Sequence, residues 1–123
     1  MYLAFKLLSL RGLIYNQVMN TSDAIQGMAN KIVRRFHPTR IILFGSQARG
    51  DENINSDVDL LIVFPEAADK RKIAIDIRRS LCNFDIPKDI LVTTPTEIDR
   101  RGDLIGTVLH AALSEGKIIY KRT

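Results

Sequence analysis

The sequence predicts a small α/β (α+β) domain built on a single sheet that is flanked by helices. The chain has 123 residues, a length that fits one domain. Hydrophobic residues make up 46% and charged residues 26%, which is typical of a globular protein and does not favour disorder of the whole chain. Short apolar runs rich in strand-forming residues alternate with runs of helical spacing, which indicates one sheet with helices packed on it.

The first predicted helix starts at the capping residues 20–22 and ends at Phe36. Its apolar residues recur every three or four positions, and Pro38 stops it. Residues 40–44 form a short apolar run that ends at Gly45, which predicts a strand. The polar residues 46–56 predict one short helical turn followed by a loop.

The second half of the chain continues the alternation. Residues 58–64 are apolar on both faces, which predicts a central strand, and Pro65 ends it. We expect a helix over 68–82 and a strand over 89–93. A second helix is expected around 104–113, where its apolar residues should join the core and Gly116 should end it. Residues 118–120 are expected to add an edge strand, so the sheet should have three to four strands.

Residues 1–18 form an apolar segment of uncertain status ahead of the domain, which we place at residues 19–123. Lys6 and Arg11 interrupt the apolar stretch and argue against a secretory signal. The segment is either an extension appended to the domain or an amphipathic helix that packs on a partner, and the sequence does not choose between the two.

Cysteine content and hydropathy bear on location. Cys82 is the single cysteine, so a disulfide within the chain and a multi-cysteine metal site are excluded. No run approaches 18 apolar residues, so we expect no transmembrane helix and no membrane partner. A reducing, cytoplasmic location is the simplest expectation.

The charges are unevenly distributed along the chain. The net charge is +4, yet residues 41–66 carry five anionic residues and one cationic residue, Arg49. An acidic segment within a basic chain suits a site that holds divalent cations while its surroundings attract an anion. The net charge falls short of a dense basic cluster, so we do not expect direct nucleic-acid binding.

Three carboxylates are the candidate metal ligands. Asp57 and Asp59 are two positions apart on a predicted strand, so they share one face with their Cα atoms roughly 6–7 Å apart. Asp89 begins the next strand at a corresponding edge. Carboxylates converging in this way repel one another unless cations lie between them, and their oxygens suit Mg²⁺ or Mn²⁺. Two such ions can hold a triphosphate, activate a nucleophile and stabilise a leaving pyrophosphate.

The residues after the first predicted strand suit a phosphate. Gly45 allows the backbone to approach a phosphate closely, and the Ser46 hydroxyl and the amides at a short helix start can donate to its oxygens. Arg49 is placed to neutralise phosphate charge. A Gly-Ser turn or an Asp-x-Asp pair alone is common, so the combination carries the argument.

One pattern in the sequence resembles that of a known superfamily. It consists of Gly45-Ser46, then ten further residues, then Asp57-Val58-Asp59 at the start of an apolar strand. The segment GSQARGDENINSDVDLLIVF is similar to the minimal nucleotidyltransferases of the polymerase-β-like superfamily. Many of these are encoded beside a HEPN-domain protein. The resemblance covers about residues 21–120, including the ending ALSEGKIIY, and implies a small polymerase-β-like fold with one mixed sheet.

The resemblance also implies roles for individual residues. Gly45 and Ser46 match the pair that holds the nucleoside triphosphate, and Arg49 matches an arginine that frequently follows this pair. Asp57 and Asp59 match the two metal-binding carboxylates. Asp89 matches the third carboxylate, which is thought to act as base on the attacking hydroxyl. The implied cofactors are two Mg²⁺ or Mn²⁺ ions, with ATP as the nucleotide donor.

For biological role, the resemblance implies an antitoxin. In the family pairs the small transferase moves AMP from ATP onto a tyrosine of the HEPN toxin and blocks it. We therefore expect a protein adenylyltransferase that acts on a co-encoded HEPN partner, in a homo- or hetero-oligomer. Two alternatives stay open: a non-catalytic antitoxin that neutralises its partner by direct binding, and a transferase with a small-molecule acceptor.

Overall fold

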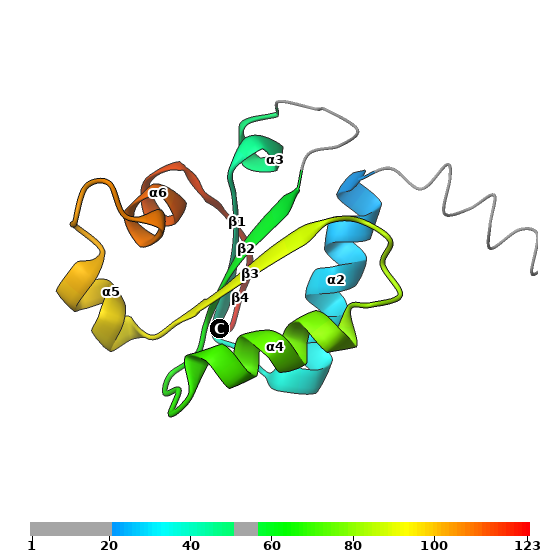
Figure 1. Ribbon diagram of the computed structural model, residues 1–123, viewed down its shortest axis with the longest axis horizontal. Helices are drawn as coiled ribbons and strands as arrows, with labels where there is room; N and C mark the ends of the chain where they lie inside the picture. The colour runs from blue at the N-terminus through cyan, green and yellow to red at the C-terminus, as the bar shows by residue number, and fades with distance from the viewer. Residues whose placement is uncertain (1–20, 51–56) are drawn as a thin grey trace, which may run out of the picture.

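Four strands form one mixed sheet in the order β3-β2-β1-β4 (Figure 1). The structure is a computed structural model, and it describes residues 21–50 and 57–123. The strands are β1 (Arg40–Phe44), β2 (Val58–Val63), β3 (Lys88–Thr93) and β4 (Lys117–Lys121). Strand β1 is antiparallel to both β2 and β4, whereas β2 and β3 are parallel. The predicted single mixed sheet with flanking helices is confirmed.

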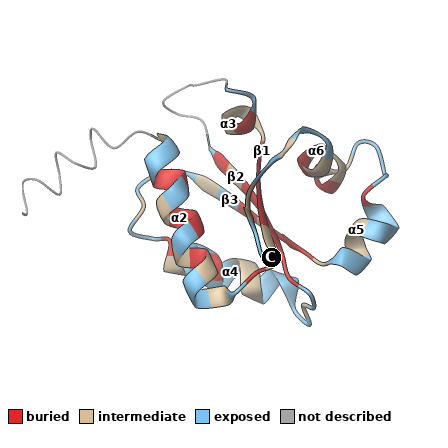
Figure 2. Ribbon diagram, turned by 180° about the vertical axis from the view of Figure 1, so that it is seen from behind, coloured by how far each residue is buried: buried red, intermediate tan, exposed pale blue. Residues whose placement is uncertain are grey.

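Helices cover both faces of the sheet. Helices α2 (Thr21–Phe36) and α4 (Lys70–Ser80) lie on one face, and α5 (Pro95–Arg101) and α6 (Val108–Glu115) lie on the other (Figure 1). The larger core cluster joins α2 and α4 to the sheet, and the smaller one joins α6 to β1 and β2. Both clusters share β2, where residues 60–63 are fully buried, as its apolar run predicts (Figure 2).

The chain between β3 and α6 differs from the sequence prediction. Residues 95–101 form α5, which the sequence analysis did not predict, and α6 begins at Val108 instead of near Leu104. Thr94 caps α5 and Pro95 occupies its first turn, while Thr107 caps α6. These capping residues are the signals that mark the true helix starts. The expected core positions Leu104 and Ile105 lie in the connecting loop, where they are 48% and 88% exposed.

Gly116 ends α6, as the sequence predicts, but it does so without a left-handed turn. Its φ of −76° lies in the ordinary extended range. A Cβ atom at this position would lie 2.2 Å from the Ala112 carbonyl oxygen and 2.4 Å from Cγ2 of Ile42. Glycine is therefore required because the end of α6 passes directly against β1.

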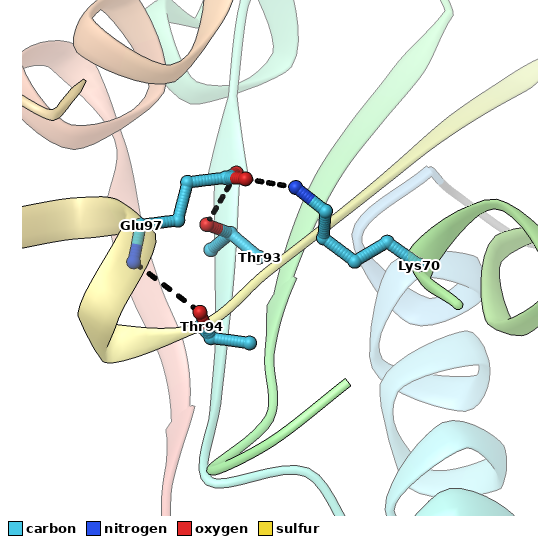
Figure 3. Close-up of polar contacts among 4 residues, drawn as sticks. All are labelled: Lys70, Thr93, Thr94 and Glu97. Atoms are coloured by element: carbon cyan, nitrogen blue, oxygen red, sulfur yellow. Dashed lines mark hydrogen bonds and ion pairs between the residues drawn. The ribbon is translucent and has the colours of Figure 1, made fainter. Parts of the chain in front are cut away.

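A cluster of polar side chains joins the two helical layers around the edge strand β3 (Figure 3). Thr93 is fully buried at the end of β3, and its hydroxyl donates to Glu97 of α5 at 2.9 Å. The second carboxylate oxygen of Glu97 accepts from Lys70, in the first turn of α4. The backbone N–H of Glu97 donates to the Thr94 hydroxyl at 3.3 Å. Glu97 thus connects α4 and α5, which lie on opposite faces of the sheet.

We expect Glu97→Ala to destabilise the fold by about 1–3 kcal/mol, because the buried Thr93 hydroxyl loses its acceptor. Urea denaturation followed by circular dichroism measures this change. Thr93→Val combined with Glu97→Ala is the control, and it should recover part of the loss because no buried donor then remains unpaired. Equal losses in the single and double variants would contradict the role given to the Thr93 hydroxyl.

Within residues 21–50 and 57–123, no helix is long and apolar enough to cross a membrane. The predictions made for residues 1–18 and for the loop at 51–56 fall outside the described residues.

Candidate active site

Three adjacent strands bring the predicted site residues to one end of the sheet. Phe44, the last residue of β1, pairs with Asp59 of β2, and Asp59 pairs in turn with Asp89 of β3. Register partners on parallel strands point to the same side of a sheet, so Asp59 and Asp89 share a face. Asp57 is exposed and immediately precedes β2, two positions before Asp59. The structure therefore gathers the three carboxylates that the sequence analysis singled out.

The charges at this end of the sheet act on Asp59. Burial raises the pKa of the Asp59 carboxyl, and the negative charges of Asp89 and Asp57 raise this pKa further. The positive charge of Arg49 acts in the opposite direction on the same pKa. Crowded carboxylates of this kind are stabilised by a divalent cation, and their oxygens are hard ligands. The donor chemistry therefore fits Mg²⁺ or Mn²⁺.

Arg78 of α4 contacts the third carboxylate. Its Nη2 atom lies 3.3 Å from Oδ1 of Asp89, and both side chains are more than half exposed. As arranged here, no three His, Cys, Asp or Glu side chains among the described residues are close enough to hold a metal ion. Binding a metal with all three carboxylates therefore requires their side chains to lie closer together than they do here.

The sequence analysis did not predict this contact of Arg78. A signal was nevertheless present. Helix α4 connects the parallel strands β2 and β3, so its last turn comes just before the start of β3. A cation in that last turn is thus a neighbour of the carboxylate that begins the next strand.

Gly45 lies directly against Asp59. Its φ of 74° and ψ of −155° belong to a region that glycine alone adopts readily. A Cβ atom on residue 45 would lie 2.2 Å from Oδ2 of Asp59. The Gly45 carbonyl oxygen accepts from the backbone N–H groups of Ala48 and Arg49, which begins the short helix α3 (Ser46–Arg49). The absent side chain thus lets the β1–α3 turn and the Asp59 carboxylate share this space.

Arg49 makes an ion pair with the end of α6. Its Nη1 atom lies 3.3 Å from Oε2 of Glu115, and both side chains are about half exposed. The sequence analysis did not predict a role for Glu115. An exposed pair of this kind is weak and exchanges readily, so an anion could replace Glu115 as the partner of Arg49.

Comparison with known proteins identifies the family. A family model described as a nucleotidyltransferase domain matches residues 26–113. The chain belongs to this nucleotidyltransferase family. The match spans Gly45, Ser46 and all three carboxylates, so the described site lies within the family domain. Proteins of this family transfer nucleotides, and the chain is accordingly a transferase by family. A search of the curated proteins finds no match.

Two solved structures share the fold. One is a protein from Sulfolobus solfataricus assigned as a nucleotidyltransferase, with 22% identity, a TM-score of 0.56 and coverage of 89% of this chain and 86% of that chain. The other is a chain of a toxin–antitoxin structure with AMP-PNP, with 19% identity, a TM-score of 0.55 and coverage of 79% and 73%. At these identities the likeness shows the fold.

Proposed function

We propose that this nucleotidyltransferase moves a nucleoside monophosphate, AMP from ATP, onto a hydroxyl acceptor in a metal-dependent reaction. The observation that carries the proposal is the position of Asp59, which lies between Gly45 on one side and Asp89 on the other. This arrangement places a backbone suited to a triphosphate directly beside carboxylates suited to a divalent cation.

Each residue has a defined task in the proposed reaction. The Gly45–Ser46 turn holds the triphosphate through the Ser46 hydroxyl and backbone amides, and Arg49 exchanges Glu115 for a phosphate oxygen. Asp89 accepts the proton of the acceptor hydroxyl, whose oxygen bonds to the α-phosphorus. The bond from the α-phosphorus to its bridging oxygen breaks, and pyrophosphate leaves with that oxygen.

Asp57 and Asp59, with Asp89, would hold the divalent metal. Two Mg²⁺ or Mn²⁺ ions bound there supply charge stabilisation for the entering and leaving oxygens. The raised pKa of Asp59 supports this assignment, because a carboxylate crowded by two others gains most from a cation.

For the acceptor, we propose a tyrosine of a co-encoded HEPN toxin, which would make this protein an antitoxin. The resemblance in the Gly45–Asp59 segment supports this role, as does the fold shared with a toxin–antitoxin structure. Two open hollows described in the structure are lined by residues 35, 36, 76, 79 and 80, and by residues 30, 33, 34 and 120. Neither includes a site carboxylate.

The test is transfer from labelled ATP. We expect the purified protein with Mg²⁺ to add about 329 Da, the mass of AMP less water, to its co-encoded neighbour, as read by mass spectrometry. EDTA should abolish the addition. Transfer that persists in EDTA would contradict a metal-dependent mechanism.

The raised pKa of Asp59 predicts a pH-dependent stability. The folded state keeps the Asp59 proton at pH values where the unfolded chain, with its ordinary pKa of 3.8, has released it. Without metal, the free energy of unfolding should therefore fall as the pH rises through the interval between 3.8 and the raised pKa.

Mg²⁺ at 100 times its Kd should add about 2.7 kcal/mol to the free energy of unfolding at neutral pH, a rise in Tm on the order of 10 °C. Thermal scans with and without Mg²⁺ from pH 4 to 8 measure both effects, and a Tm that Mg²⁺ leaves unchanged would contradict them.

The contact between Arg78 and Asp89 favours a second candidate function. If that pair persists when the protein works, only two carboxylates remain for a metal, and the protein would act as an antitoxin by binding its partner without transfer. This candidate predicts a stable complex with the partner and no added mass on it.

A further inference from the structure

An open hollow between α2 and α4 is lined by cationic side chains. Its volume is about 450 Å³, and its lining residues are Arg35, Phe36, Asp76, Arg79 and Ser80. We call this the α2–α4 groove. Arg35 comes from the last turn of α2 and Arg79 from the last turn of α4, so two separate helices each direct an arginine to one groove.

Neither arginine has an ion-pair partner within residues 21–50 and 57–123. Both are exposed. Helix α4 carries five cationic residues and one anionic residue, Asp76, so the groove lies in a positive surface. Two unpaired guanidinium groups at a groove of this size attract carboxylates, which arginine binds through paired hydrogen bonds.

The groove and the candidate site both use residues of the last turn of α4. Arg78 precedes Arg79 in α4 and contacts Asp89, whereas Arg79 lines the groove. A ligand that binds Arg79 therefore contacts the residue next in sequence to Arg78, whose side chain contacts the third site carboxylate.

We propose that the α2–α4 groove binds an acidic segment of the polypeptide that carries the acceptor hydroxyl. This inference rests on the proposed function and names its substrate class: a protein hydroxyl flanked by glutamate or aspartate. Arg35 and Arg79 bind the acidic side chains, and Phe36 provides an apolar contact.

The composition of the groove favours a polypeptide over RNA. Asp76 and Phe36 also line the groove, so a ligand bound there meets a hydrogen-bond acceptor and an apolar ring as well as the two arginines. A polypeptide supplies backbone N–H groups that Asp76 can accept from, in addition to carboxylates for the arginines.

A copolymer of glutamate and tyrosine tests the inference, because it carries both acidic side chains and acceptor hydroxyls. The test variant is Arg35→Gln with Arg79→Gln, and the control is Arg100→Gln with Arg101→Gln in α5, on the opposite face of the sheet. Both changes remove two positive charges from exposed positions. Copolymer affinity is measured by fluorescence anisotropy without nucleotide, and transfer is measured separately with ATP and Mg²⁺.

We expect the test variant to bind the copolymer about three- to tenfold more weakly and to raise its KM by the same factor, with kcat unchanged. The control should change either value less than twofold. Equal effects in the two variants, or a fall in kcat alone, would overturn the inference. Dependence of poly(U) binding on Arg35 and Arg79, with none for the copolymer, would also overturn it in favour of RNA.

Failure of the proposed function gives a different result. If the copolymer binds through Arg35 and Arg79 but wild-type protein transfers no nucleotide to the copolymer or to the co-encoded neighbour, transfer to tyrosine is contradicted, whereas the groove stands as a docking surface for an acidic polypeptide. If transfer occurs and neither pair of arginines affects it, the groove is contradicted and the proposed function stands.

Discussion

Asp57→Asn combined with Asp59→Asn is expected to reduce nucleotide transfer on the order of 10³-fold. Metal ions contribute several kcal/mol of charge stabilisation to such a transition state, and each 1.36 kcal/mol is a factor of ten in rate. The asparagine amides preserve the shape of the two side chains and remove their negative charge. Initial rates of AMP transfer from labelled ATP, at saturating Mg²⁺, measure the loss.

The fold of this variant should survive, because removing charge from a crowded carboxylate relieves repulsion. The pKa of Asp59 is raised by its burial and by two neighbouring anions, which means that the ionised form is the unfavourable one in the folded chain. At neutral pH without metal, the Tm of the variant should therefore equal or exceed that of the wild type. The stabilisation by Mg²⁺ predicted above should disappear.

Asp85→Asn is the matched control for these substitutions. Asp85 is an exposed aspartate in the loop before β3, four positions ahead of Asp89, and it contributes nothing to the pKa of Asp59. Its substitution should leave transfer within about twofold of wild type. A double variant at 57 and 59 that still transfers AMP would contradict the metal-site assignment, and one that unfolds would indicate a structural role for these carboxylates.

The position of the site carboxylates could be predicted from sequence because strand geometry is regular. Alternation along a strand put Asp57 and Asp59 on one face, and Asp89 at the start of the next apolar run put it beside them; the register Asp59–Asp89 agrees with this. The single sheet was equally predictable. Strand β2 is apolar on both faces, and only a central strand is buried on both faces.

What the sequence could not supply are contacts set by tertiary packing. The Arg78–Asp89 and Arg49–Glu115 pairs depend on how helices dock on the sheet, and exposed cations in a sequence look alike. The apolar residues Leu104 and Ile105 fitted a helical spacing, yet the capping threonines at 94 and 107 divide this region into two helices. Local hydrogen bonding there prevailed over hydrophobic periodicity.

Gly45→Ala is expected to impair both stability and transfer. The backbone at Gly45 lies in a region that costs a non-glycine residue about 1–3 kcal/mol. The added Cβ would also lie 2.2 Å from Oδ2 of Asp59, so the carboxylate must move. We expect a total loss of about 2–4 kcal/mol in the free energy of unfolding. Displacement of a reacting group by 1 Å can cost on the order of 10²-fold in rate, and transfer should fall accordingly.

Gly50→Ala separates backbone strain from the contact with Asp59. Gly50 also has a positive φ, 77°, but a Cβ there meets nothing within 4 Å among the residues that the structure describes. Its substitution should cost only about 1 kcal/mol, the usual penalty for a left-handed alanine, and should leave transfer nearly unchanged. A transfer defect as large as that of Gly45→Ala would indicate that flexibility of the turn, and not the space beside Asp59, limits the reaction.

A double-mutant cycle with Asp59→Ala isolates the contact itself. The added Cβ at position 45 would lie 2.2 Å from Oδ2 and 3.2 Å from Cγ of Asp59, but 3.5 Å from its Cβ, an ordinary van der Waals distance. Asp59→Ala removes the two close atoms and keeps the third. In that background, Gly45→Ala should cost only its backbone strain, so the two losses of unfolding free energy should fall short of additivity by about 1–3 kcal/mol. Strict additivity in urea denaturation would mean that Asp59 does not lie against Gly45 in solution, and the proposed pairing of the phosphate turn with the metal carboxylate would lose its structural basis.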